Sequence, residues 1–458
     1  MNIRNNSADS VIHIMNIHKF LFDLLLALMV AITVLLLLQT PEFDYREVML
    51  IVSLVVFAIT SRLIFKCDGK ITTPLVFYIM VCFLAMNLGS YYFIYDSHIR
   101  QINTRIVAIP QYDHYILLFS VFIIVSILIY VYNMAKARAL LTRRGGGSSY
   151  SLKEVNLSAL DKPSYVFLAI SSIIALLVVF VSGIEYEVFV SPIVVVGICH
   201  LTTINLRNLS LSRLVYALAT IITTILLLRY RFVFAQIAMA SVIIVLGLLD
   251  GPATQKRKIK IVGLFIGAIV ATLLYGVISE VYKLNLLSGE NSYDVREILT
   301  NPTLLSEWFN RQIYRVFTIW SHLAGNIIEY VDRHGFFYGS TYIASLLSLL
   351  GYHTTHLPEL SARLISANYA QVGLVGEGYA NFGFIGAVAN VMVGYLFIDW
   401  FRDNFRKKPS VITLCIYSLA PAKILIDGGS INSMFASAIA TVILFFPLVI
   451  FRKVSRVK

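Results

Sequence analysis

The chain has 458 residues, of which 58% are hydrophobic and only 14% are charged, and its mean hydropathy is +0.79. A soluble domain carries about 25% charged residues, so this composition excludes a soluble globular protein of this length. The formal net charge is +12, but no basic pattern interleaved with aromatic residues accompanies it, so nucleic acid is not an expected partner.

Apolar runs of about 18 to 23 residues recur along the chain, and each is long enough to cross a hydrocarbon core of about 30 Å. They predict an all-α polytopic membrane protein with about 12 transmembrane helices. The first run lacks a small-residue cleavage site, so we interpret it as a retained span. The predicted spans are 20–39, 47–65, 72–95, 114–135, 163–182, 187–203, 210–228, 232–249, 260–282, 379–399, 410–428 and 434–451.

Lysine and arginine are distributed unevenly between the two sides of this topology. With the N-terminus inside, 25 of them fall in inner segments and 11 in outer segments. Because basic residues close to span ends stay in the cytoplasm, we predict that both termini are cytoplasmic and that the long loop is periplasmic.

The loops divide the chain into five predicted parts. The first transmembrane helices occupy 1–135, and a basic Gly/Ser-rich cytoplasmic linker occupies 136–162. Central transmembrane helices follow in 163–283, then the periplasmic loop domain in 284–376 and the C-terminal transmembrane helices in 377–458. The short inner loops contain no Walker A sequence, so no nucleotide-binding domain is expected.

A tight outer turn between the seventh and eighth spans contains Arg229, Tyr230 and Arg231. Two arginines in a short outer loop run against the usual charge bias. They are suited to gripping a phosphate or diphosphate at the outer membrane surface, because guanidinium groups offer forked donors. Alternatively, both side chains extend to lipid headgroups without binding substrate.

The long outer loop contains a predicted helix over about 303–331, followed by a turn at 332–335. Six polar residues of this helix advance at about 100° per residue onto one edge. We expect Arg311 and Arg315 to contact an anion, and His322 to do polar or proton-handling work. A polar face that simply meets water is the alternative. The six are Arg311, Arg315, Thr318, His322, Asn326 and Glu329.

The tenth span opens with the sequence GEGYANFGFIG at 376–386. Its glycines allow close approach of a neighbouring helix or a ligand to the backbone. Glu377 lies among them and is a candidate general base or ligand of a sugar hydroxyl. The competing interpretation is helix capping, because acidic residues favour a helix N-terminus.

This stretch resembles the GE-x-Y-x-NFG-x-x-G signature of the bacterial oligosaccharide repeat-unit polymerases, the Wzy-type O-antigen and capsule polymerases. The motif covers about eleven residues, and the rest of the chain resembles the family in topology alone.

The resemblance implies a GT-C-like enzyme of the bacterial inner membrane that joins oligosaccharide units carried on undecaprenyl diphosphate. The family's motif glutamate corresponds to Glu377. The departing diphosphate would be stabilised by the arginines described above, Arg229, Arg231, Arg311 and Arg315. We also expect Arg363, Tyr379 and Asn381 to bind the diphosphate or sugar. A metal-independent reaction without a cofactor is expected, and a polysaccharide chain-length regulator is a possible protein partner.

Three other functions remain open at this stage. Another lipid-linked glycosyltransferase would use an acid after the first span, such as Glu42 or Asp44. An O-antigen ligase uses the same donor with a similar topology. A flippase or transporter would need ionisable groups near the bilayer midplane, for which Lys423 and Asp427 are the best pair.

Overall fold

The structure is a computed structural model. It describes residues 19–20, 22–31, 45–68, 71–89, 112–143, 239–240, 243, 274, 277–278, 281, 285, 294–344, 355–364, 372–407, 411–427, 431, 434, 438–439 and 442. Within some helices, including residues 309–319 of the loop helix, only the backbone is described. All regular secondary structure in these residues is helical, as the sequence predicted.

Three described helices are long and apolar enough to cross a membrane. They are α2 (Tyr45–Asp68), α6 (Tyr112–Arg143) and α16 (Gly373–Lys407), and their candidate spans are Glu47–Asp68, Ile116–Ala139 and Gly373–Phe405. They correspond to the predicted second, fourth and tenth spans. The α6 helix continues to Arg143, beyond the predicted start of the linker at residue 136, because its sequence stays helix-favouring up to the glycine run.

Three further predicted spans are represented by shorter apolar helices. Residues Phe22–Ala31 belong to the first, and Ile416–Leu425, within α17 (Val411–Asp427), belong to the eleventh. The third consists of α3 (Thr73–Phe77) followed by the π-helix η1 (Tyr78–Leu88). The remaining predicted spans lie outside the described residues, apart from isolated positions.

The described helices belong to two compact units. The first contains α2, α3, η1, α6, most of α13 (Pro302–His334), η4 (Ser340–Ile343), α15 (Leu357–Leu364) and α16 up to Asp399. The second contains α12 (Val295–Thr300), the first turns of α13, the end of α16 and α17. Asp294 caps α12 by accepting a hydrogen bond from the Arg296 backbone N–H at 2.8 Å.

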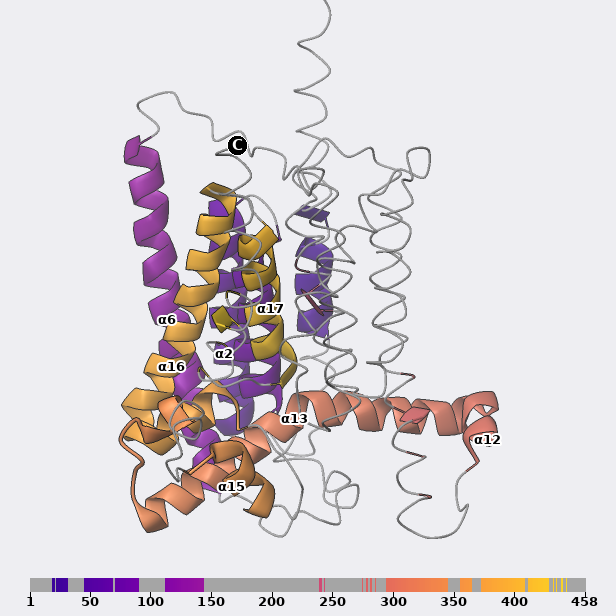
Figure 1. Cartoon of the computed structure of the whole chain (residues 1–458). Helices are drawn as coiled ribbons and strands as arrows, with labels where there is room; N and C mark the ends of the chain where they lie inside the picture. Colours follow the sequence, from indigo (N-terminus) through magenta and orange to yellow (C-terminus); the bar gives the residue numbers. More distant parts are fainter. Residues whose placement is uncertain are drawn as a thin grey trace, which may run out of the picture. The chain divides into compact units, whose positions relative to one another are not determined.

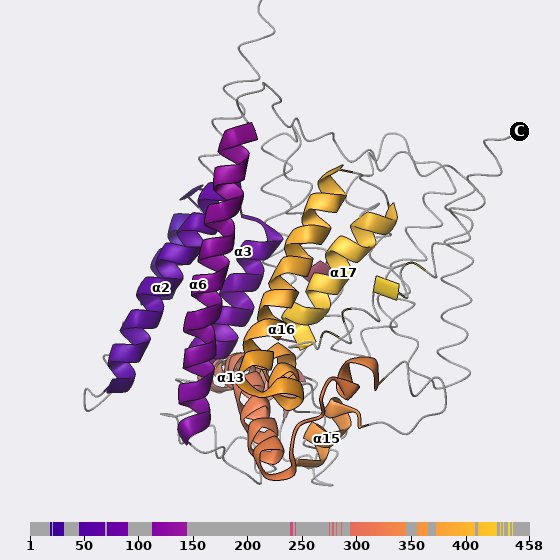
Figure 2. The same cartoon turned by 90° about the vertical axis from the view of Figure 1, so that its left-hand side faces the viewer.

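The core of the first unit is built from aromatic side chains of α2, η1 and α6. The Phe57 and Phe83 rings stack with centroids 3.9 Å apart, and the Tyr78 hydroxyl donates to Ser126 Oγ at 2.9 Å. Figure 2 shows these helices side by side. Buried rings supply large apolar area, and the buried Tyr78 hydroxyl has a hydrogen-bond partner.

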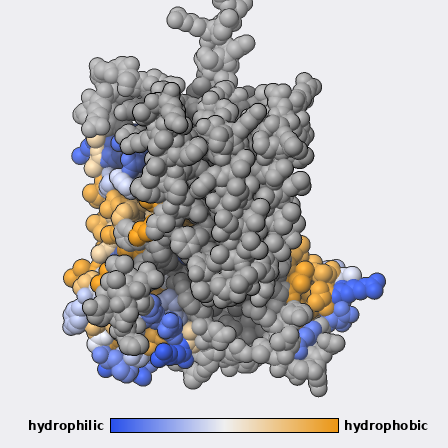
Figure 3. All heavy atoms as spheres, in the orientation of Figure 1, coloured by the Kyte–Doolittle hydropathy of each residue, from blue (hydrophilic) through white to orange (hydrophobic). Residues whose placement is uncertain are grey.

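Both α2 and α6 present an apolar face away from this core. On α2 the exposed side chains follow helical spacing, at Val48, Ile51, Val52, Val55 and Ile59, while Phe57 and Ile64 are buried. Figure 3 shows hydrophobic surface between hydrophilic regions on the left-hand side, where Figure 1 has α6 and α16. A continuous exposed apolar stripe on a long helix is typical of a surface that faces lipid.

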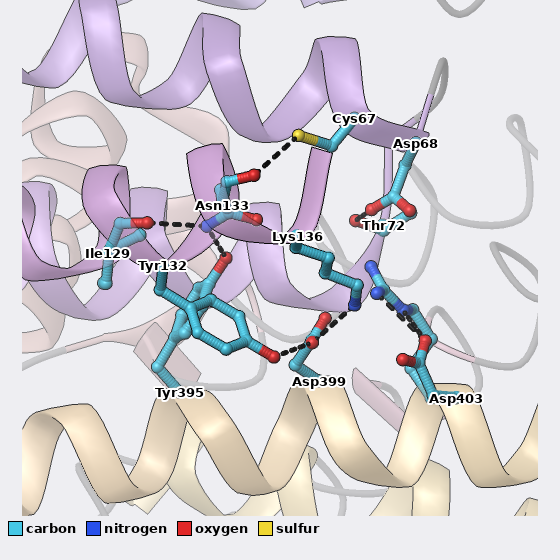
Figure 4. A network of polar contacts seen from close by, with 11 residues as sticks. Cys67, Asp68, Thr72, Ile129, Tyr132, Asn133, Lys136, Tyr395, Asp399 and Asp403 are labelled. Atoms are coloured by element: carbon cyan, nitrogen blue, oxygen red, sulfur yellow. Dashed lines mark hydrogen bonds and ion pairs between the residues drawn. The ribbon is translucent and has the colours of Figure 1, made fainter. Parts of the chain in front are cut away.

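A polar network joins the ends of α6 and α16 (Figure 4). Asp399 Oδ2 accepts hydrogen bonds from Lys136 Nζ at 2.6 Å and from the Tyr132 hydroxyl at 2.7 Å. One turn away, Asn133 Nδ2 donates to the Tyr395 hydroxyl at 2.9 Å. The predicted topology assigns these helix ends to the same, inner side, and the structure places them together.

The loop helix α13 continues three residues beyond its predicted end at 331, through part of the predicted turn. It stops at His334, and Gly335 follows with φ +91°, a left-handed conformation that glycine adopts without a Cβ penalty. In Figure 1 its part within the first unit runs crosswise to the long helices, near one end of α6 and α16. The predicted short helix at 341–350 is described only in its first turn, as η4.

Candidate functional site: a broken helix that holds Glu377

The glycine-rich motif breaks α16 instead of opening a straight helix. Phe382 has φ −143° and ψ 24°, and Gly383 has φ 63° and ψ −150°. The second pair of angles lies in a region essentially restricted to glycine. The predicted single span from 379 to 399 is therefore interrupted near its start, at residues 382 and 383. A first arm, residues 373–381, precedes the break, and a second arm begins at Phe384.

The two arms fold back on each other to form a helical hairpin. Gly378 and Gly386 are in such close contact that a Cβ added to Gly378 would lie 2.2 Å from the Gly386 carbonyl oxygen. In an unbroken helix these residues would be about 12 Å apart. Asn390 Nδ2 closes the hairpin further along by donating to the Leu374 carbonyl at 3.1 Å. The motif glycines thus serve a chain reversal.

Glu377 lies on the first arm and is 1% exposed. Its Oε2 accepts hydrogen bonds from the Ile431 backbone N–H at 2.7 Å and from Asn390 Nδ2 at 3.3 Å. A buried carboxylate is stable only when donors replace its lost water. This arrangement differs from capping of its own helix, because the donors come from the second arm and from residue 431.

A short strap after α13, residues 337–343, is tied to the hairpin through Asn381. The Asn381 Oδ1 accepts from the Gly339 N–H at 2.8 Å, while its Nδ2 donates to Thr341 Oγ1 at 2.6 Å and to the Glu377 carbonyl at 2.8 Å. The Phe337 N–H donates to the Ala380 carbonyl at 2.9 Å. Asn381, predicted to bind substrate, therefore uses its amide to hold the strap.

Tyr342 connects the strap to the buried carboxylate. Its hydroxyl donates to Asn390 Oδ1 at 2.7 Å, and the amide of the same asparagine donates to Glu377. Burial, together with the smaller effect of the negative charge of Glu377, raises the pKa of Tyr342 to about 12. The phenol therefore remains a hydrogen-bond donor at neutral pH.

The loop helix packs directly on the first arm. A Cβ added to Gly376 would lie 3.3 Å from Ala324 Cα, and the Tyr379 hydroxyl donates to Asp332 Oδ1 at 2.8 Å. Buried apolar residues complete this contact: Ile327, Val331, Leu357, Val372 and Ala380. Residue 376 can be only glycine or another very small residue, because the helix backbones nearly touch.

His322 lies in the most buried part of α13. It is 1% exposed, and its Nε2 lies 3.2 Å from Asn326 Nδ2. Burial lowers the pKa of His322 to about 4, so the ring is neutral at physiological pH. The alternative of a polar face that simply meets water does not hold for this part of α13: residues 321–328 are all buried, because the hairpin and η1 cover this stretch. Ser321 Oγ, for example, donates to the Ala85 carbonyl at 2.6 Å.

The structure describes the arginines that were predicted to bind an anion to different extents. Arg229 and Arg231 lie outside the described residues. Arg311 and Arg315 lie one turn apart on α13, in the part where only the backbone is described. Arg363 is exposed in the last turn of α15. Their contact with an anion therefore remains a prediction.

Asn390 and Tyr342 are the residues that the sequence analysis missed. Asn390 is 4% exposed within an otherwise apolar helix, and a polar side chain inside a predicted span is a signal for a structural or functional contact. Tyr342 gave no comparable signal, because only the folded strap brings it to Asn390.

The chain matches one protein family along almost its whole length, over residues 11–458. It belongs to that family. The description of the family is "Family of unknown function (DUF6032)". No curated protein and no solved structure matches the chain.

Proposed function

We propose that the chain is a glycosyltransferase of the bacterial inner membrane that polymerises oligosaccharide repeat units carried on undecaprenyl diphosphate. The proposal includes about twelve spans in a GT-C-like arrangement and a periplasmic site. The observation that carries it is the hairpin, in which the motif that resembles the polymerase signature buries Glu377 against Asn390 and Ile431.

In the proposed reaction a hydroxyl of the incoming unit attacks the anomeric carbon of the growing chain. A new carbon–oxygen bond forms, the bond from the anomeric carbon to the diphosphate oxygen breaks, and the hydroxyl proton leaves. Negative charge builds on the departing undecaprenyl diphosphate, and Arg311 and Arg315, with Arg229 and Arg231, would stabilise it.

The chemistry of Glu377 fits two roles in this reaction. As a carboxylate it can accept the proton of the attacking hydroxyl, or it can orient that hydroxyl by a hydrogen bond. His322 is less suited to carry a proton at neutral pH than the sequence suggested, because its pKa of about 4 leaves the ring neutral. It can still serve as a polar contact.

Deleting the gene and separating the surface polysaccharide by size tests the proposal. If the chain is a polymerase, the ladder of bands from polysaccharides with increasing numbers of repeat units should collapse to the band of a single repeat unit. Loss of every repeat from the lipid A core would indicate a ligase instead, and accumulation of carrier-linked units inside the cell would indicate a flippase. An unchanged ladder would exclude all three of these functions.

Two point variants then test the site in the complemented strain. Glu377→Gln keeps the size of the side chain and one acceptor oxygen, but it replaces the other oxygen with an NH2 donor and removes the charge, so it should shorten the ladder at unchanged protein level. Glu359→Gln, at an exposed residue of α15, is the matched control. A wild-type ladder for Glu377→Gln would exclude its carboxylate from the reaction.

Arg315→Ala should stop elongation if a guanidinium on this turn of α13 holds the diphosphate. Arg333→Ala is its control, because Arg333 lies on the same helix, is exposed and pairs with Glu329 one turn away. Long-chain polysaccharide from the Arg315 variant would count against the proposed anion contact.

A further inference from the structure

Four exposed and largely apolar side chains gather at the tip of the hairpin, at the start of the strap and on the residue that precedes the strap. We call them the aromatic rim: Phe336, Tyr338, Phe382 and Ile385. Their exposed fractions are 38%, 77%, 51% and 78%. Exposing apolar side chains of this size to water costs free energy, so a cluster of them indicates a contact surface.

The rim is held in a defined geometry. The Phe336 ring lies against Gly383, 3.3 Å from where a Cβ would be, and packs edge-on against Tyr338 and Tyr379, with centroids 6.3 and 6.1 Å apart. Phe382 lies 3.4 Å from the corresponding point on Gly339. The rings are therefore presented by the hairpin and the strap together.

The rim continues into an apolar stripe of the second arm. Ile385, Ala389 and Leu396 are all exposed and recur at helical spacing, on a helix apolar enough to cross a membrane. This stripe faces lipid by the same argument as the stripe on α2, so the rim adjoins lipid-facing surface.

Charged and polar groups lie near the rim in the chain. Arg333 and His334, in the last turn of α13, are both exposed and precede Phe336 by three and two residues. Aromatic residues between an apolar stripe and a charged helix end are typical of the boundary between lipid headgroups and acyl chains.

We propose that the aromatic rim inserts into the membrane interface on the α13 side and fixes the depth of the hairpin. Its occupant is the bilayer itself, at the boundary between headgroups and acyl chains. This inference is independent of the enzymatic activity, because it follows from the exposure and position of the four side chains. It would set the depth at which Glu377 is held.

Tryptophan fluorescence in vesicles tests the proposal. Tyr338→Trp is introduced into the full chain after Trp308, Trp320 and Trp400 have been changed to Phe, and the protein is reconstituted in phosphatidylcholine. Lipids brominated near the glycerol end of the acyl chain should quench this tryptophan strongly, lipids brominated near the chain end should quench it less, and aqueous iodide should leave it almost unchanged.

His334→Trp in the same background is the matched control, and iodide should quench it because residue 334 is exposed beside Arg333 at the end of α13. Strong iodide quenching of the Tyr338→Trp protein, with no effect of brominated lipid, would overturn the proposal and would indicate a surface that faces water or another protein.

A second measurement avoids the tryptophan-free background, in case that protein does not fold. Ile385→Cys and His334→Cys are made in the otherwise unchanged chain and treated in intact vesicles with a water-soluble maleimide, with the unsubstituted chain as the blank. Residue 385 should be protected while residue 334 reacts. Equal, rapid labelling of both would contradict insertion of the rim.

Discussion

The α16 helix carries a buried carboxylate near each end, and the two are held in different ways. Near the C-terminal end, Asp399 is bonded by the Lys136 ammonium and the Tyr132 hydroxyl, on regular helical backbone. Near the N-terminal end, Glu377 is bonded by an amide and a backbone N–H, beside a break in the helix. The first arrangement joins two helices, whereas the second positions one side chain.

The backbone shows the same contrast. The cluster around Asp399 needs no unusual conformation, while the one around Glu377 needs Gly383 in a glycine-only region and Gly378 against Gly386. Unusual backbone is retained where the surrounding structure over-determines it, and such positions concentrate at functional sites. This difference is why we place the chemistry at Glu377 and assign a stabilising role to Asp399.

The largest effect is expected from Gly378→Ala. Its Cβ would lie 2.2 Å from the Gly386 carbonyl oxygen, and neither backbone can yield without opening the hairpin. We expect a loss of about 3 kcal/mol or more, measured as loss of monodisperse protein after detergent extraction and as a lower melting temperature.

Gly394→Ala is the matched control on the same helix. Its Cβ would meet the Leu374 Cδ1 methyl group at 3.0 Å, which can shift by rotation of that side chain, so a much smaller loss is expected. Equal effects of the two substitutions would contradict the close backbone contact that defines the hairpin.

Asp399→Asn should have the next largest effect, on stability alone. Lys136, 21% exposed, would lose the anion at 2.6 Å, and breaking such a pair from one side costs about 3 kcal/mol. Unfolding in mixed detergent–SDS micelles measures it. Adding Lys136→Met should restore much of the loss, and failure of this rescue would argue against an ion-pair clamp.

The exposed pair of Glu329 and Arg333 supplies the control for that experiment. Because the Arg333 side chain is 64% exposed, Glu329→Gln should change stability by less than about 0.5 kcal/mol.

Acidification should lower the stability of the protein through protonation of His322 on α13. His322 has a folded pKa of about 4, below its ordinary value of 6.5, so the unfolded chain binds the proton first. The stability from this group is complete above about pH 6.5 and is lost as the pH falls toward 4. Between about pH 7 and pH 5 the free energy of unfolding should fall by about 2 kcal/mol.

His322→Gln should remove that part of the pH dependence, and His334→Gln, at an exposed position on the same helix, should not. Melting curves of both variants at the two pH values provide the measurement. An unchanged pH slope in the His322 variant would mean that another group controls acid stability.

Tyr342→Phe should have the smallest effect. It removes one hydrogen bond, from the phenol to Asn390 Oδ1 at 2.7 Å, which contributes about 1 kcal/mol. Tyr338→Phe, at a side chain that is 77% exposed, is the control and should leave the melting temperature unchanged. A larger effect at residue 338 would contradict the assignment of Tyr342 as the link between strap and hairpin.

The sequence predicted elements better than contacts. The loop helix expected at about 303–331 is α13, and three of the expected long spans are α2, α6 and α16. Helical period and apolar length are local properties, which is why these could be predicted. The burial of His322 could not, because a polar edge in the sequence does not show what packs against it.

By itself, the sequence determined a helical membrane chain, the approximate bounds of its loop helix, and a short motif in which Glu377 is flanked by glycines. Only the tertiary structure decided that the motif reverses direction, that Asn381 ties down the strap, and that Asn390 and residue 431 supply the donors to Glu377. The physical reason is that hydrophobic length is encoded residue by residue, whereas a buried carboxylate obtains its hydrogen bonds from groups distant in sequence, which only the folded chain brings together.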